Sequence, residues 1–238
     1  MSYNYSQYQT DLANLLVIPS TDPNFLTVLP NTIDDAELRI YRDLDLLNTS
    51  TTDSSAAFVT NTRSFTLPAA NGTFVVTQDV YAITPFGTVN PDLGTRNALS
   101  PCSREMLDFM FPSSAASGVP QYFAMSTQGR ILVGPWPDQA YQAEVHGTIR
   151  PTPLGSTNVT TLLTQFFPDV FMAASMVFGS GYLKNYGAAV DDPQQAASWE
   201  AHYQKLIASA QVEEARKKFT SQGWSSKQPA QLATPPRT

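Results

Sequence analysis

The sequence predicts an α+β protein, in which a helical bundle made by both ends of the chain adjoins a central antiparallel β-sandwich-like region. A helical apolar pattern lies near the start, short alternating runs broken by turn residues fill the middle, and two more helical patterns follow. We expect one structural unit with two lobes. We expect its N-terminal helices at residues 1–47, the β-region at residues 48–155, the C-terminal helices at residues 156–220 and a flexible tail at residues 221–238.

Two helices are expected before the β-region. The first covers residues 5–16, and Pro19 and Pro23 separate it from the second, at residues 29–47. We expect the second helix to run directly into a strand. The apolar side of the first helix is formed by Tyr8, Leu12, Leu15 and Leu16.

The second helix has a start signal and an apolar face. Thr32 and Asp35 are spaced like a capping box, and acidic residues around them suit the positive end of the helix dipole. The apolar positions recur every three or four residues, at Ile33, Ala36, Ile40, Leu44 and Leu47. Arg39 and Arg42 lie off this face, where each can pair with a carboxylate of this chain or of another. An ordinary amphipathic helix has the same spacing.

The middle of the chain should form an antiparallel β-region. The expected strands cover residues 47–52, 57–60, 63–67, 73–83, 121–126, 130–134 and 141–150. Asn71-Gly72 and Gln128-Gly129 are turn signals between them. A short helix at residues 103–111 interrupts the series.

The C-terminal helices should complete the bundle. One begins near Thr161, is interrupted at Pro168 and resumes over residues 169–183. Its second part is apolar almost all round, so it should lie at the centre of the bundle. Its small residues would let a neighbouring helix approach closely, and they are Ala173, Ala174, Gly179 and Gly181.

The last helix should start near Asp192 as N-cap, with Pro193 in its first turn. Its inner face is formed by Trp199, Tyr203, Leu206 and Ala210. We expect it to fray over Glu213, Glu214, Arg216, Lys217 and Lys218. Residues 221–238 are rich in Pro, Ser and Gln, and we expect them to be disordered in the isolated protein.

Charge is sparse and unevenly distributed. Charged residues make up 14% of the chain, below the roughly 25% that is usual, which suits a protein packed against neighbours. Residues 1–204 hold 8 Lys and Arg against 18 Asp and Glu, a net charge of −10, whereas residues 205–238 hold 6 against 2, a net charge of +4. An acidic body with a basic tail suggests charged partners.

No membrane association is expected. The first residues lack the basic and apolar stretches of a signal peptide. The longest apolar stretch, at residues 170–183, is shorter than the roughly 20 residues that span a bilayer. We therefore expect a soluble protein that is not exported by itself.

The sequence indicates no catalytic, cofactor or metal site. His146 alternates with Glu144 in an expected strand, His202 lies on the last helix, and neither has a second ligand at a metal-type spacing. Cys102 is the single cysteine, so it excludes an intrachain disulfide, and no general base lies near it in the sequence. Asp79 and Glu144 on neighbouring strands could imitate a glycosidase carboxylate pair, but the sequence does not fix their separation. We expect no enzymatic activity.

Four segments, taken in order, resemble the phage head-to-tail adaptors of the tail tubular A-like family. AE-x-RI-x-RDLDLL, within residues 29–47, is similar to that family's second helix. The other three are TLPAANGTFVVTQDVYAITP, PQYFAMSTQGRILVGPWPDQAYQAEVHGTIRPTPL and FFPDVFMAASMVFGSGYLKNYG, which resemble its reference strand, its strand–turn–strand unit and its apolar helix. The similarity extends over most of residues 5–210, but the Ser/Thr-rich residues 48–62 and the long tail depart from the family pattern.

The resemblance implies a non-enzymatic structural protein of the virion, located at the head–tail junction after assembly in the host cytoplasm. Proteins of this kind generally form rings of about twelve copies beneath the portal protein. They carry the tail nozzle protein, and DNA passes through their central channel during packaging and ejection. Tail fibres are a further candidate partner, and no cofactor is implied.

The charge distribution agrees with that role, because an acidic channel repels DNA and lets it pass. We hypothesise that the basic end of the chain tethers it to the portal through Arg216, Lys217, Lys218, Lys227 and Arg237, with Arg39 and Arg42 as further interface residues. A solvated, fraying helix end is the alternative explanation. Truncation after Ala210 is expected to abolish portal binding and leave the fold intact.

Other readings remain open at this point. A tail-completion or stopper ring would differ in its neighbours rather than in its chemistry. A carbohydrate-binding or depolymerase module of a tail fibre would explain the β-region, but such modules usually form β-helical trimers with aromatic platforms. The three tryptophans of this chain are scattered, and its long helices have no place in that architecture.

Overall fold

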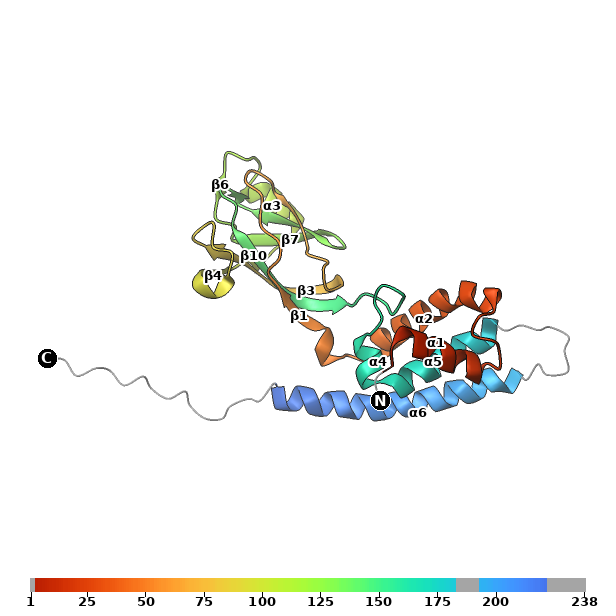
Figure 1. Cartoon of the computed structure of the whole chain (residues 1–238). Helices are drawn as coiled ribbons and strands as arrows, with labels where there is room; N and C mark the ends of the chain where they lie inside the picture. Colours follow the sequence, from red (N-terminus) through yellow and green to blue (C-terminus); the bar gives the residue numbers. More distant parts are fainter. Residues whose placement is uncertain (1–2, 183–192, 222–238) are drawn as a thin grey trace.

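The computed structural model describes residues 3–182 and 193–221, which form two lobes (Figure 1). One lobe is a helical bundle of α1 (Tyr5–Leu15), α2 (Pro23–Asp43), α4 (Leu162–Phe166), α5 (Pro168–Tyr182) and α6 (Pro193–Ser221). The other, the β-lobe, contains the described strands and the short helix α3 (Arg104–Met110). The predicted α+β class, with a bundle made by both chain ends, is confirmed.

Helix α2 starts earlier and ends earlier than predicted. Asp22 is its N-cap and accepts hydrogen bonds from the backbone of Asn24 (2.8 Å) and Phe25 (2.9 Å). Pro30 lies inside the helix, and the lost backbone hydrogen bond is offset because the residues around it bury apolar surface. Thr32 is therefore a buried interior residue rather than a cap.

The prediction also placed Leu44 and Leu47 in this helix, but the backbone at Leu44 is already extended. Leu47 opens the 3-10 turn η1 (Leu47–Thr49), so the expected strand at residues 47–52 begins only at β1 (Ser50–Asp53). The chain thus passes from the bundle to the β-lobe through a turn.

Helix α5 lies at the centre of the bundle, as predicted, and contacts α1, α2, α4 and α6. The Tyr8 hydroxyl lies 2.6 Å from Ser175 Oγ and donates to the Phe171 carbonyl (3.0 Å), while the Tyr8 and Phe171 rings stack at 4.5 Å. A methyl group at Gly179 would lie 3.3 Å from Leu16, so the expected close approach occurs there. Gly181 has no such neighbour within 4 Å.

The break before α5 also follows the prediction. Thr161 caps α4, and Pro168 begins α5. Helix α6 begins at Pro193, whereas the proposed N-cap Asp192 lies outside the described residues. Of the predicted inner face of α6, Tyr203 and Ala210 are buried, whereas Trp199 and Leu206 are only partly buried against the core. Ile207, which was not predicted, is also buried.

Two four-stranded sheets enclose the core of the β-lobe. The first has the order β1–β10–β3–β4, where β10 is Gln142–Arg150, β3 is Thr73–Thr84 and β4 is Thr95–Ala98. The second has the order β2–β8–β7–β5, with bounds Ser64–Thr66, Arg130–Gly134, Tyr122–Thr127 and Ser100–Pro101. A small parallel pair joins β6 (Ser117–Gly118) to β9 (Trp136–Pro137), and a turn, η2 (Pro91–Leu93), precedes β4.

The β-region differs from the prediction in several details. Strand β4 and the two-residue strands β5, β6 and β9 were not expected, and β4 pairs with the end of β3 from Tyr81 to Thr84. The expected strand at residues 57–60 is reduced to one bridge between Ala57 and Gln142. The reason is that the chain turns at residues 59–62, where the Thr62 N–H donates to the Val59 carbonyl (3.0 Å).

Helix α3 forms where the short helix was predicted, with Ser103 as its N-cap. It packs on β7 and β8 through the fully buried Leu107. The opposite side of α3 remains at the surface of the β-lobe.

Candidate assembly surfaces

Of the two arginines expected to pair with carboxylates, Arg39 does so within its own chain. Its guanidinium forms a bidentate pair with Glu200 of α6 (2.7 and 2.5 Å) and lies 4.2 Å from the centre of the Tyr203 ring. The Tyr203 hydroxyl in turn donates to Asp43 (2.8 Å). The hydrogen bond to Glu200 raises the pKa of Arg39, and the same bond lowers the pKa of Glu200. This cluster fastens α6 to α2.

Arg42 is placed differently. Its side chain is exposed, and it has no ion-pair partner within residues 3–182 and 193–221. Of the two arginines singled out in α2, Arg42 is the one that can reach a separate molecule.

The basic end of α6 does not fray within the described residues; the helix continues to Ser221. Glu214, only 5% exposed, accepts a hydrogen bond from the backbone N–H of Leu47 (2.9 Å). Lys217 lies 2.6 Å from Glu213 and 2.8 Å from Glu214, and its ammonium group lies 5.0 Å from the centre of the Phe167 ring. Hydrogen bonds to these two glutamates raise the pKa of Lys217.

Lys218 pairs with Asp45, and Arg216 is exposed. The other two predicted interface residues, Lys227 and Arg237, lie outside the described residues, as does the tail at residues 222–238. The expected fraying is wrong because the end of α6 packs beside η1, where its charges find partners. That arrangement depends on the path of α6 across the bundle, which local sequence does not encode.

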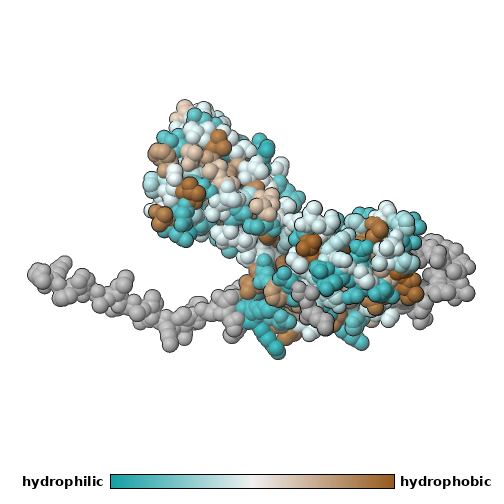
Figure 2. All heavy atoms as spheres, in the orientation of Figure 1, coloured by the Kyte–Doolittle hydropathy of each residue, from teal (hydrophilic) through white to brown (hydrophobic). Residues whose placement is uncertain are grey.

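The β-lobe exposes large apolar side chains that sequence reasoning missed. In the loop between β3 and β4, residues 85–93, Phe86, Val89 and Leu93 are 60%, 78% and 80% exposed. On α3, Phe109 is 88% exposed and Met106 48%. Figure 2 shows hydrophobic residues on the visible face of this lobe. Exposed apolar side chains of this size are candidate contact sites for other molecules. For the residues of the loop, the available signal was their position among turn residues, where no core would form.

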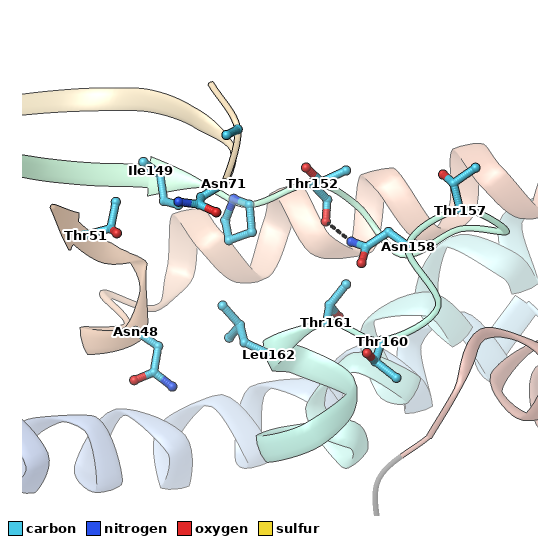
Figure 3. A pocket seen from close by; sticks show the side chains of 12 residues that line it. Asn48, Thr51, Asn71, Ile149, Thr152, Thr157, Asn158, Thr160, Thr161 and Leu162 are labelled. Atoms are coloured by element: carbon cyan, nitrogen blue, oxygen red, sulfur yellow. Dashed lines mark hydrogen bonds between the residues drawn. The ribbon is translucent and has the colours of Figure 1, made fainter. Parts of the chain in front are cut away.

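A groove of about 600 Å³ lies where the two lobes meet (Figure 3). Its lining is made of uncharged residues from η1, β1, the turn before β3, the end of β10, the segment between β10 and α4, and the start of α4: Asn48, Thr51, Ala70, Asn71, Ile149, Pro151, Thr152, Thr157, Asn158, Thr160, Thr161 and Leu162. The Asn158 amide donates to the Thr152 carbonyl (2.7 Å) and stabilises the wall of the groove. Its lining residues include no acid, base or thiol.

The residues considered for catalysis have structural roles. Glu144 is buried and accepts a hydrogen bond from Arg96 (2.8 Å), and it lies opposite Tyr81 in the sheet, whereas Asp79 lies opposite His146. His146 exchanges a hydrogen bond with the Thr52 hydroxyl (3.0 Å). Burial raises the pKa of the Cys102 thiol, which disfavours the thiolate. Within the described part of the chain, no three His, Cys, Asp or Glu residues are grouped as metal ligands.

In the described ranges no helix is both long and apolar enough to cross a membrane. A search of curated proteins found no match to this chain. The model of the SU10 adaptor protein family, in contrast, matches residues 3–226. Since this match covers both lobes, the chain belongs to the SU10 adaptor protein family, a family of phage head-to-tail adaptors.

Proposed function

We propose that copies of this adaptor form a ring, of about twelve subunits, between the portal protein and the tail nozzle protein of a phage. The family match over residues 3–226 supports this proposal, because the family consists of phage head-to-tail adaptors. The ring assembles in the host cytoplasm, and tail fibres are a further candidate partner. The protein has no enzymatic role in this proposal.

The charge of the chain supports a channel for DNA. Residues 1–204 carry a net charge of −10. Clustered Lys and Arg would release counterions and hold the phosphates, whereas an acidic wall lets the genome slide past. DNA therefore passes through the ring without specific binding during packaging, retention and ejection.

In this proposal the subunit makes contacts through two parts, the β-lobe and the bundle with its tail. The exposed apolar loop at residues 85–93 and the exposed face of α3 provide subunit or nozzle contacts on the β-lobe. Arg42 and the tail residues Lys227 and Arg237 contact the portal. Arg39, Lys217 and Lys218 contribute indirectly, because their pairs with Glu200, Glu214 and Asp45 hold α6 in place.

The proposal is tested by the mass distribution of the purified chain, alone and mixed with portal rings from the same phage. We expect a shift to a complex of one portal ring with about twelve copies. A stable trimer that ignores the portal would overturn the proposal and favour a carbohydrate-binding module of a tail fibre.

Two variants then locate the portal contact. Arg42→Glu should reduce the number of copies bound per portal ring, because it reverses an exposed charge on the bundle. Arg130→Glu is the matched control, since Arg130 is also exposed but lies on the β-lobe. Truncation after Ser221 removes Lys227 and Arg237 and retains all of α6. Undiminished portal binding by that truncated chain would contradict the tether.

A further inference from the structure

The chain crosses between the two lobes twice, and a buried carboxylate of the bundle holds each crossing. The first crossing, residues 44–49, leads from α2 to β1, and Glu214 accepts the backbone N–H of Leu47 there (2.9 Å). The second, residues 151–161, leads from β10 to α4, and Glu37 accepts the backbone N–H of Leu154 (3.1 Å). Glu37 and Glu214 are only 3% and 5% exposed. Two independent crossings thus share one kind of contact.

The two carboxylates differ in their surroundings. Glu214 has a cation beside it, because Lys217 binds it at 2.8 Å. Glu37 has none on its own helix; its neighbours there are Asp34, one turn earlier, and Tyr41, one turn later. A buried negative charge without a cation is costly, so the contact made by Glu37 is the weaker of the two when Glu37 is ionised.

The titratable and charged groups around Glu37 come from three elements. On α2 they are Asp34, whose pKa is also raised by burial, and Tyr41. Burial raises the pKa of Tyr8 on α1, and the negative charge of Glu37 also raises it. At Tyr41, the positive charge of Arg150 at the end of β10 opposes the increase in pKa that burial causes. The Tyr41 hydroxyl is buried without a hydrogen-bond partner in the described part of the chain. Among the described residues, Glu37 accepts one hydrogen bond, from the Leu154 amide.

We propose that Glu37 and Glu214 act as two latches that hold the β-lobe in one orientation relative to the bundle, and that ionisation of Glu37 opens the second latch. In the closed latch the neutral carboxyl of Glu37 accepts the Leu154 amide through its carbonyl oxygen. The ionised carboxylate is stabilised by hydration, and it becomes accessible to water when residues 151–161 move away from α2. The β-lobe then turns about the first crossing, which Glu214 still holds.

The direction of the pH effect follows from the pKa of Glu37. Burial raises this pKa, the hydrogen bond from Leu154 lowers it, and the Asp34 charge raises it again, to about 7 from the ordinary value of 4.5. A carboxyl whose pKa is raised in the closed state favours that state at low pH and loses the preference as the pH rises through the raised value. The latch is therefore closed below pH 4.5 and opens as the pH rises through about 7.

The test measures the distance between the lobes in the isolated full-length chain by double electron–electron resonance. Spin labels are placed at two exposed positions, Gln128→Cys on the β-lobe and Ala201→Cys on α6, after Cys102→Ser. At about pH 5.5 the distance distribution should be narrow, and at about pH 8.5 it should broaden. Glu37→Gln, which keeps an acceptor but cannot ionise, should stay narrow at both values. Glu105→Gln on α3 is the matched control and should broaden like the parent chain.

Two outcomes would overturn the inference: a parent distribution that does not change between the two pH values, or a Glu37→Gln chain that broadens as the parent does. The inference goes beyond the proposed ring, and the measurement uses a single chain. A failure of ring assembly would leave this result unaffected, and an unchanged distribution would leave the proposed adaptor role standing.

Discussion

Removing residues 211–221 should destabilise the bundle, whereas removing only residues 222–238 should not. A chain that ends at Ala210 loses the hydrogen bond from Leu47 to the Glu214 carboxylate, which is worth about 1.5–3 kcal/mol because the acceptor is charged. It also loses the contact of Lys217 with the Phe167 ring, about 0.5–1 kcal/mol. The exposed pair of Lys218 with Asp45 adds little. The expected loss is about 3 kcal/mol, a large part of the stability of a typical domain.

Thermal unfolding followed by far-ultraviolet circular dichroism checks this expectation. A loss of about 3 kcal/mol lowers the Tm of a chain of this size by roughly 6–12 °C. The chain that ends at Ser221 is the matched control and should melt like the full-length protein. Glu214→Ala isolates the main contact, and Glu214→Gln keeps an acceptor for Leu47. Equal melting temperatures for the two truncated chains would refute the reasoning. They would also restore the sequence-based expectation that truncation after Ala210 leaves the fold intact.

Three further predictions concern the core, the pH dependence and the surface. Tyr8→Phe should cost about 1–2 kcal/mol of unfolding free energy in urea titrations, because it leaves Ser175 unpaired in the core; an unchanged midpoint would contradict this. Glu37→Gln should remove a pH dependence: the parent chain loses up to about 3 kcal/mol between pH 4.5 and about 7, since its folded pKa lies above the unfolded value. Urea midpoints at acidic and alkaline pH measure the difference, and parallel curves for the two proteins would refute it. Phe109→Ser should leave Tm unchanged, because the ring is 88% exposed, but weaken assembly as measured by mass distribution. Unimpaired assembly would exclude α3 as a contact surface.

Local sequence rules predicted those elements whose signals are local. The break between α4 and α5 follows from Pro168, which cannot donate a backbone hydrogen bond, and α3 follows from Ser103 as a cap. The start of α2 was missed because Thr32 and Asp35 imitate a cap, whereas the burial of the residues around Pro30 sustains the helix through the proline. Tertiary packing outweighed a local signal there.

The candidate surfaces were less accessible to such rules. The segment Thr95–Ala98 has little preference for a strand, and β4 forms because the end of β3 offers a pairing edge. The partners of Arg39 and Lys217 lie on elements whose relative position follows from the whole bundle. Their charge and their place off the apolar face were readable from the sequence, but the identity of their partners was not.

The nesting of the β-lobe between the two halves of the bundle has a consequence for the order of folding. The β-lobe is built from one continuous stretch of chain, so its contacts can form without either terminus. The bundle instead joins residues very distant in sequence, as Tyr8 and Ser175 show. Loop closure over such a distance is slow, and synthesis proceeds from the N-terminus. During synthesis, the apolar faces of α1 and α2 therefore stay exposed until α5 leaves the ribosome. The β-lobe, which has already folded by then, shortens the loop between these helices and α5.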